Sequence, residues 1–232
     1  MKNVLIIGGT CDIGLSLGNY FKNLGYRVII GYHNSYQDLE DMIFIKCDVR
    51  NELEVEKVFN DMINKYGKID ILINLASISR DNSFLNKTKK EFMEVIETNL
   101  LGTFLCNQIY SRYIDDGIII NMGSTDGIDT YSEYSLDYSL SKNGIITLSR
   151  WIKDYTNNKV ICICPNWIDS DSTRSINKEY LENELKRIGQ SRLITMNELV
   201  DAFDKILGNN IESGCVYRID IRDDKLWIEK VY

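Results

Sequence analysis

Proline and histidine are almost missing from this chain of 232 residues, which holds one of each, Pro165 and His33. So little proline excludes a proline-rich linker, and no stretch rich in Gly and Ser divides the chain. The six cysteines form no Cys-x-x-Cys pair, and one histidine does not complete a convincing zinc ligand set with them. We therefore predict a single domain over residues 1–232 that holds no metal.

The chain also lacks a basic block and a long apolar run. Lys and Arg number 27 against 34 Asp and Glu, which gives a net charge of −7. Phosphate contacts need clustered Lys and Arg, so we expect no nucleic-acid partner. No stretch approaches the about 18 apolar residues of a membrane span, and the apolar N-terminal run is too short for a signal peptide. Scattered cysteines fit a reducing compartment. These absences predict a soluble, cytoplasmic protein that binds no membrane.

Short apolar runs alternate with longer amphipathic ones along the whole chain. Most of the short runs are continuous in Val, Ile and Leu, as parallel strands buried on both faces should be. The predicted strands are residues 3–9, 27–32, 42–49, 69–77, 117–124, 159–166 and 215–221. The predicted helices are residues 13–23, 52–66, 89–113, 135–155 and 196–207. This order predicts an α/β fold, a doubly wound seven-stranded parallel sheet with helices on both faces.

The segment 167–191 interrupts that alternation. It is polar and contains one helix candidate, near Lys178–Ile188. It leaves from the carboxyl end of a late strand, which is the edge where open α/β sheets bind ligands. We predict a lid over the binding site, and a plain surface excursion remains the alternative.

The stretch "IIGGTCDIG" follows the first predicted strand and opens a helix. Free backbone N–H groups and the helix dipole at such a place favour the pyrophosphate of a dinucleotide. Gly8 would permit the tight turn, and Gly14 would permit close approach of the helix to the sheet. Because the spacing is not Gly-x-Gly-x-x-Gly, an ordinary strand–turn–helix remains possible.

The second predicted strand ends in "IIGYHNS", with Tyr32 where an acid would bind the 2′-hydroxyl of an adenosine ribose. Without a carboxylate to repel a 2′-phosphate, NADP is preferred over NAD. His33 is a candidate to contact that phosphate, or it is an ordinary surface-loop histidine. Asp48, at the end of the third strand, is a candidate to bond the adenine amine, or it caps its loop.

The pentapeptide "YSLSK" places Tyr138 and Lys142 four residues apart at the start of a predicted helix, and so on one face. A nearby cation lowers the pKa of a phenol, which would suit it to proton transfer at neutral pH. Tyr-x-x-x-Lys alone is equally typical of an ordinary amphipathic turn.

Seven short motifs stand in one order along the chain. They are "GGTCDIG" (8–14), "CDV" (47–49), "NLAS" (74–77), "TNLLGTF" (98–104), "IINMGS" (119–124), "YSLSK" (138–142) and "CPNWIDS" (164–170). Together they resemble the motifs of the short-chain dehydrogenase/reductase family, most of all its 3-oxoacyl-carrier-protein reductase type. The resemblance covers nearly the whole chain and implies a Rossmann-type fold.

The resemblance implies an oxidoreductase that transfers hydride between NADP(H) and a carbonyl or secondary alcohol. The substrate would be a small ketone or a 3-oxoacyl thioester. Tyr138 would be the general acid, Lys142 would bond the nicotinamide ribose, and Ser124 would orient the carbonyl. Asn99 would hold a water that links Lys142 to solvent, or it is a satisfied buried amide. Alternatively, Ser124 is an ordinary serine in a turn, without a catalytic role.

The same resemblance implies a set of cofactor-binding residues, some of which depart from the family pattern. They are Gly8, Thr10, Cys11, Asp12, Ile13, Gly14, His33, Asp48, Val49, Asn74, Ala76, Tyr138, Lys142, Pro165, Ile168 and Ser170. Asp12 stands where the family has a glycine, and we expect it to turn away as a helix N-cap. After Asp220 the chain reads "DIRDDK" instead of the usual Asp-Gly-Gly, which leaves the C-terminal packing open.

Three further expectations follow. Family resemblance implies a homodimer or homotetramer that forms through the helices of residues 89–113 and 135–155 and through the last strand. The alternatives for function are a dinucleotide-binding sensor or scaffold with little turnover, and the same chemistry with NAD.

Overall fold

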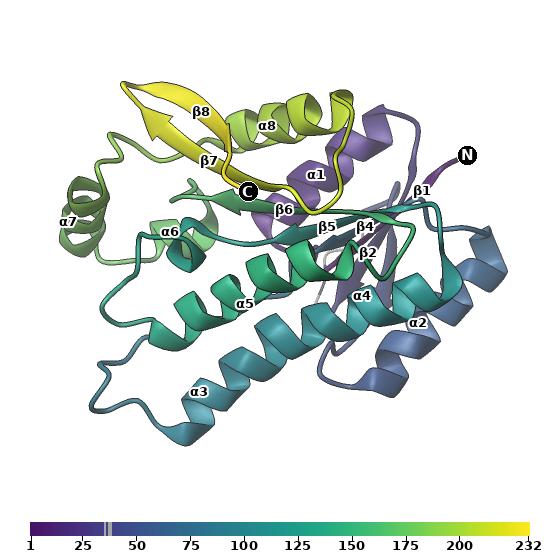
Figure 1. The fold of residues 1–232 in the computed structure, drawn as a ribbon, viewed down its shortest axis with the longest axis horizontal. Coiled ribbons are helices and arrows are strands. Elements are labelled where there is room, and N and C mark those ends of the chain that lie inside the picture. Colours follow the sequence, from purple (N-terminus) through teal and green to yellow (C-terminus); the bar gives the residue numbers. More distant parts are fainter. Residues whose placement is uncertain (35, 37–38) are drawn as a thin grey trace.

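A computed structural model describes residues 1–34, 36 and 39–232. Its strands form one eight-stranded sheet in the order β3-β2-β1-β4-β5-β6-β7-β8 (Figure 1). In chain order they are β1 (Asn3–Ile7), β2 (Arg27–Tyr32), β3 (Ile43–Lys46), β4 (Ile71–Asn74), β5 (Ile118–Met122), β6 (Lys159–Pro165), β7 (Val216–Arg222) and β8 (Lys225–Lys230). The predicted α/β fold is therefore present, as a doubly wound arrangement whose strand order reverses between β1 and β4.

The prediction of seven parallel strands is wrong in one respect, because β8 is an additional strand. It pairs antiparallel with β7 through a hairpin whose turn is Asp223-Asp224. Both residues have positive φ, 48° and 59°, as both central residues of the tightest hairpin turns must. The turn signal was an Asp-Asp pair rather than the commoner Asn-Gly, and this is why the sequence did not reveal the hairpin.

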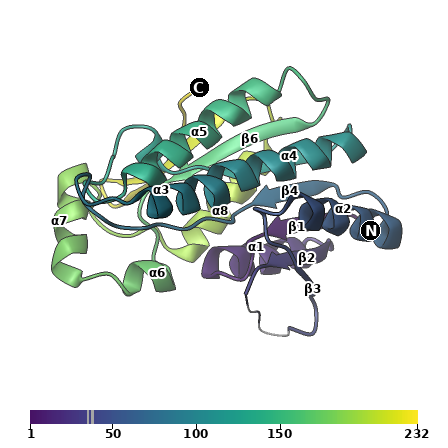
Figure 2. The same ribbon diagram turned by 90° about the horizontal axis from the view of Figure 1, so that it is seen from below.

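Helices cover both faces of the sheet, with α1 and α8 on one side and α2, α4 and α5 on the other (Figures 1 and 2). The α-helices are α1 (Asp12–Asn23), α2 (Glu52–Tyr66), α3 (Lys89–Val95), α4 (Gly102–Tyr113), α5 (Leu136–Ile152), α6 (Asp171–Arg174), α7 (Lys178–Ile188) and α8 (Met196–Gly208). A π-helical segment, η1 (Ile96–Leu101), joins α3 to α4, and a 3₁₀ turn, η2 (Thr125–Gly127), follows β5.

The apolar core confirms the interpretation of the continuous apolar runs. In β1, Val4 and Ile6 pack on the α1/α8 side, and Leu5 and Ile7 pack on the α2/α4 side. All four are at most 1% exposed. Burial of such a side chain contributes about 1.5–3 kcal/mol, so a strand covered on both faces is apolar at every position.

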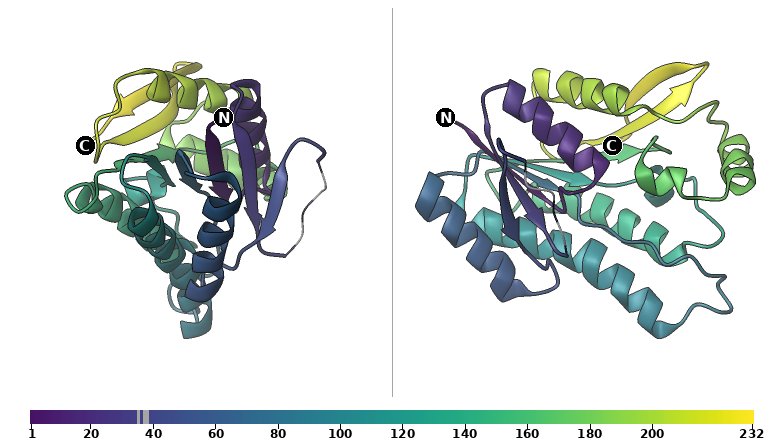
Figure 3. Two further views of the ribbon diagram at one scale, coloured as in Figure 1. Left: turned by 90° about the vertical axis from the view of Figure 1, so that its right-hand side faces the viewer. Right: turned by 180° about the vertical axis from the view of Figure 1, so that it is seen from behind.

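The segment 167–191 lies beyond the carboxyl end of β6 and carries the short helix α6 and the longer helix α7. Both helices project from one end of the sheet (Figure 3). An isolated parallel bridge between Ile168 and Ile194 joins the two ends of the segment. Among the described residues, no helix is both long and apolar enough to cross a membrane. The described residues also contain no group of three or more His, Cys, Asp or Glu side chains that could hold a metal ion.

Candidate active site

The carboxyl edge of the sheet brings together Ser124, Tyr138 and Lys142. Ser124 follows β5 and caps η2, where its Oγ accepts a hydrogen bond from the backbone N–H of Asp126 at 3.2 Å. Tyr138 and Lys142 stand on the first turns of α5, which packs closely against η2. The Ser124 hydroxyl is close enough to lower the pKa of the Tyr138 phenol as a hydrogen-bond partner. The three side chains thus come from adjoining elements at one edge of the sheet.

Lys142 is held beneath this place. Its side chain is buried, and its Nζ donates to the carbonyl oxygen of Met122 at 2.9 Å. The same Nζ is 5.3 Å from the centroid of the Tyr138 ring. Burial lowers the pKa of Lys142 to about 8, and the neighbouring Cys162, Cys164 and Asp126 act in the opposite direction. Lys142 therefore remains largely a cation at neutral pH, next to the phenol.

The expectation that Lys142 makes Tyr138 unusually acidic is wrong for this geometry. Burial raises the pKa of Tyr138 above its ordinary value, and the negative charge of Asp126 raises it further. Hydrogen bonding with Ser124 lowers the pKa of the phenol by less than the other two effects raise it. Tyr138 is accordingly a neutral phenol at physiological pH, which is the form that can give a proton.

Asn99 is fully buried within the π-helical segment η1. Its Oδ1 accepts from the backbone N–H of Ile78 at 2.8 Å, and its Nδ2 donates to the Ile78 carbonyl and to Ser141 Oγ, each at 3.0 Å. The side-chain amide thus has protein partners on both ends, as in the alternative of a satisfied buried amide. The water-holding role remains a prediction.

The turn between β1 and α1 has the shape that a pyrophosphate needs. Gly8 has φ +74°, and a Cβ there would lie 2.5 Å from Ala76 backbone atoms. A Cβ on Gly14 would lie 2.4 Å from the Cα of Gly9, so helix and turn are as close as glycine permits. Cys11, the N-cap of α1, makes no capping hydrogen bond with its side chain. The first backbone N–H groups of α1 can therefore donate hydrogen bonds to phosphate oxygens.

Asp12 does not cap its own helix, contrary to our expectation. Its Oδ2 accepts from the backbone N–H of Asp171 at 2.6 Å and from Nη2 of Arg174 at 3.2 Å. Arg174 also pairs with Asp169 and Asp171, each at 2.7 Å. The carboxylate that replaces the family's glycine is thus turned toward α6 and ties segment 167–191 to the cofactor turn.

The ends of β2 and β3 form a small charged cluster. The Asp48 carboxylate is 2.6 Å from Nη2 of Arg50 and 3.3 Å from Nε2 of His33. Hydrogen bonds from Arg50 lower the pKa of Asp48 to about 2, so Asp48 is ionised. The sequence analysis missed Arg50, which places a guanidinium beside the same carboxylate as His33. Its position two residues after Asp48 was the available signal.

The other predicted cofactor residues also lie at this edge of the sheet. Thr10 and Ile13 belong to the first turn, Val49 and Ala76 follow β3 and β4, and Pro165 ends β6. Ile168 and Ser170 lead into α6, which Ser170 caps through the N–H of Thr173. Asn74 is the exception, because its buried Nδ2 donates to the amide oxygens of Asn107 and Asn121 at 2.7 and 2.8 Å. Its amide therefore belongs to the core, and only its backbone remains for a cofactor.

Asp126 is the most consequential residue that the sequence analysis missed. It is half-buried two residues after Ser124, and it exerts the largest charge effect on the Tyr138 phenol. Burial raises the pKa of its carboxyl. The signal in the sequence was an acid two residues after the candidate catalytic serine.

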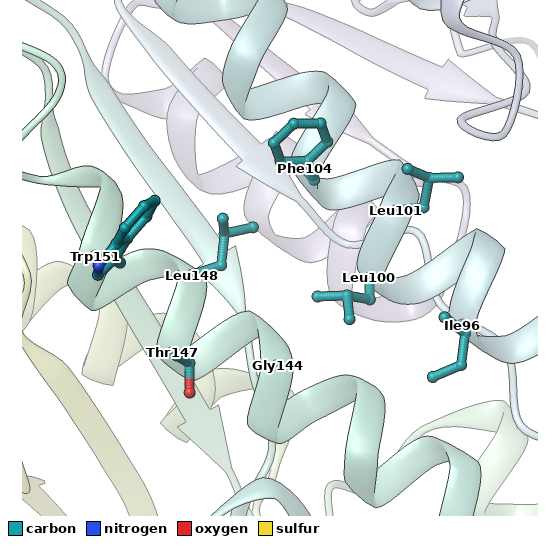
Figure 4. A pocket seen from close by; sticks show the side chains of 8 residues that line it. All are labelled: Ile96, Leu100, Leu101, Phe104, Gly144, Thr147, Leu148 and Trp151. Atoms are coloured by element: carbon teal, nitrogen blue, oxygen red, sulfur yellow. The ribbon is translucent and has the colours of Figure 1, made fainter.

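A separate apolar groove lies on the outer face of the molecule, away from these residues. Figure 4 shows it between η1/α4 and α5. Its lining residues are Ile96, Leu100, Leu101, Phe104, Gly144, Thr147, Leu148 and Trp151. Trp151 and Phe104 are 64% and 38% exposed, so a large apolar surface faces outward here.

Comparisons with known proteins agree with this geometry. Residues 2–181 match the short chain dehydrogenase family. The 3-oxoacyl-[acyl-carrier-protein] reductase of Bos taurus is 30% identical over 197 residues, which are 79% of this chain and 83% of the relative. MabA of Mycobacterium avium, also a 3-oxoacyl-[acyl-carrier-protein] reductase, is 26% identical over 94% of this chain and 88% of its own.

A solved structure gives the same result. A short chain dehydrogenase from Leptospira borgpetersenii, determined with bound NAD+, superposes with a TM-score of 0.84 at 28% identity, over 94% of this chain and 91% of that one. The motif order, the carboxyl-edge cluster and these matches lead to one conclusion. The chain belongs to the short-chain dehydrogenase/reductase family of nicotinamide-dependent oxidoreductases, with 3-oxoacyl-carrier-protein reductases among its relatives.

Proposed function

We propose that this oxidoreductase reduces a ketone with NADPH, and runs in reverse as an alcohol dehydrogenase when conditions favour oxidation. The observation that carries the proposal is the cluster of Ser124, Tyr138 and Lys142 beside the glycine turn. A pure dinucleotide binder would have no need of a serine hydroxyl aimed at the same place as a phenol.

The side chains divide the work of reduction. A bound nicotinamide would supply the hydride. Ser124 donates a hydrogen bond to the carbonyl oxygen, where negative charge develops, and Tyr138 gives that oxygen its proton. A neutral phenol serves here because an alkoxide is far more basic than a phenolate. The Lys142 cation, 5.3 Å from the ring centroid, stabilises the phenolate that remains.

The preference for NADPH rests on the cluster at the ends of β2 and β3. No carboxylate occupies the position of Tyr32, and the His33 imidazole and the Arg50 guanidinium flank Asp48. A guanidinium and an imidazole N–H suit a 2′-phosphate. The Leptospira protein was solved with NAD+, so dissociation constants for NADPH and NADH should be compared directly. Tighter binding of NADH would overturn the preference.

The first substrates to assay follow from the relatives. Two of them are 3-oxoacyl-[acyl-carrier-protein] reductases, so a 3-oxoacyl thioester and a set of simple ketones make a suitable panel. We further propose that residues 1–232 act as one domain in the cytoplasm, with residues 167–191 as the lid. The link from Asp12 to Asp171 and Arg174 supports the lid.

Assembly is part of the same proposal. A second copy of the chain would cover the apolar groove of Figure 4 and give a homodimer or homotetramer. Sedimentation of the protein should then show a dimer or larger, and Phe104→Glu should shift it to monomer. A wild-type monomer at micromolar concentration would contradict this.

The decisive experiment is Tyr138→Phe, which removes one hydroxyl. Turnover should fall about 100- to 10,000-fold, the usual contribution of a general acid, while NADPH binding and the unfolding midpoint stay close to wild type. Tyr131→Phe is the matched control, since Tyr131 is exposed and, among the residues that the structure describes, its hydroxyl bonds the Ile128 carbonyl alone. An unchanged rate in Tyr138→Phe would refute the acid role. NADPH binding without any turnover in wild type would favour a sensor.

A further inference from the structure

Asp126 occupies an unusual position for a carboxylate. Its backbone N–H bonds Ser124 Oγ at 3.2 Å, so it directly adjoins the group that would hold the carbonyl oxygen. Its Oδ1 accepts from the Thr130 hydroxyl at 3.0 Å, and the Thr130 carbonyl accepts from Arg187 of α7 at 2.9 Å. Asp126 therefore belongs to the stretch of chain that connects Ser124 to α7.

The carboxylate of Asp126 is poorly satisfied by the protein. In the described part of the chain its one side-chain donor is the Thr130 hydroxyl, 3.0 Å from Oδ1, and Oδ2 has no partner. A carboxylate can accept about four hydrogen bonds, so the half-buried Asp126 keeps capacity for further donors, and its Oδ2 is not among the buried atoms that lack a partner. Burial correspondingly raises the pKa of Asp126.

The nearest cation of α7 does not complete the carboxylate. Arg187 is bound to Glu184 through two hydrogen bonds of 3.1 and 2.7 Å, and it also donates to the Thr130 carbonyl at 2.9 Å. Glu184 balances the charge of Arg187, so the pair adds no net charge beside Asp126. The Lys142 ammonium bonds the Met122 carbonyl instead. Oδ2 is therefore free to accept a hydrogen bond from water or from a bound substrate.

We infer that Asp126 determines specificity, and that the substrate is a ketone with a hydroxyl group on the carbon next to the carbonyl, which donates to Asp126. This inference rests on the proposed ketone reductase function and narrows its substrate class. In the reduction, the carbonyl carbon gains hydride, its oxygen gains the Tyr138 proton, and the product is a vicinal diol. A plain ketone or a 3-oxoacyl chain, which carries no donor beside the ketone, leaves Oδ2 unpaired.

Three ketones of nearly equal size test the inference: butan-2-one, 1-hydroxypropan-2-one and 1-aminopropan-2-one. They differ only in a methyl, hydroxyl or ammonium group beside the carbonyl. The wild-type enzyme should prefer the hydroxyketone to butan-2-one in kcat/KM by roughly 10- to 100-fold, the usual effect of a hydrogen bond to a charged group. The readout is this ratio, because any effect of Asp126 on the Tyr138 phenol acts equally on both ketones and cancels.

Two variants and one control complete the design. Asp126→Asn should reduce the ratio several-fold, since a neutral amide oxygen is a weaker acceptor, and Asp126→Leu should bring it to about one. Asp129→Asn is the control, because Asp129 is exposed in the same loop and pairs with Arg218. Its ratio should equal that of wild type. Unfolding curves confirm that each variant is folded.

Each outcome decides the matter. Ketone turnover with equal rates for butan-2-one and the hydroxyketone overturns the role of Asp126 and leaves the proposed function intact. A ratio that survives Asp126→Leu also overturns it. If wild type prefers the aminoketone and Asp126→Asn abolishes that preference, the inferred hydroxyl donor is wrong, and the substrate group that donates to Asp126 is an ammonium group. No turnover of any ketone with NADPH or NADH refutes the proposed function and this inference together.

Discussion

The buried ion pair of Lys87 and Asp137 offers the sharpest test of the energetics of the site. The Nζ of Lys87 is 3.1 and 3.0 Å from the two oxygens of Asp137, and the side chains are only 5% and 0% exposed. The same Asp137 Oδ1 accepts the backbone N–H of Tyr138 at 3.0 Å. The pair therefore connects the loop before α3 to the turn of α5 that carries the candidate acid.

The cost of breaking this pair follows from its burial. At 3 Å and an effective dielectric constant near 20, the attraction is about 5 kcal/mol, most of which offsets the loss of hydration. Lys87→Met would leave the Asp137 carboxylate buried without its partner, which costs about 3–5 kcal/mol. Against a total stability of about 5–15 kcal/mol, the variant should unfold at a much lower urea concentration.

A second lysine provides the control. Lys90 pairs with Glu94 at 3.9 Å, with side chains 86% and 30% exposed. Such a pair contributes about 0–1 kcal/mol, so Lys90→Met should be close to wild type. Urea unfolding followed by tryptophan fluorescence measures both. If Lys87→Met costs no more than Lys90→Met, the reasoning from burial is refuted. Replacing both partners, Lys87→Met with Asp137→Leu, should recover part of the loss.

Three other perturbations have definite expected results. The pKa of Lys142 is about 8 in the folded protein and 10.5 in the ordinary side chain. Between these pH values the unfolded chain binds more protons than the folded one, so the free energy of unfolding rises with pH. Lys142→Met should be more stable than wild type at pH 7, and its urea unfolding at pH 7 and 10 should lack this rise. Arg174→Gln removes the ion pair with Asp12 and leaves the hydrogen bond from the Asp171 N–H. NADPH dissociation should become about two- to fivefold faster in stopped-flow fluorescence, because an exposed ion pair contributes up to about 1 kcal/mol. An unchanged rate would show that the ion pair does not restrain the lid. Gly14→Ala adds a Cβ 2.4 Å from backbone atoms of Gly9. NADPH binding measured by calorimetry should weaken at least tenfold, and an affinity equal to that of wild type would mean that the turn can shift.

The sequence by itself determined the features that depend on neighbouring residues. Continuous apolar runs such as residues 4–7 indicate burial on both faces of a strand, and that pattern predicted the parallel sheet. The four-residue spacing of Tyr138 and Lys142 placed both on one face of α5 because the helical period requires it. The order of the seven motifs indicated the family. All of these are local or ordered along the chain.

Only the tertiary structure decided which charges meet. Asp12 and Arg174 lie 162 residues apart, and Lys87 and Asp137 lie 50 apart, so no local period relates either pair. The pKa of Tyr138 was mispredicted for the same reason: Lys142 is visible four residues away, but burial and the approach of Asp126 depend on how η2 packs against α5. Electrostatic effects depend on distance and hydration in space, and the order of residues along the chain specifies neither until the fold is formed.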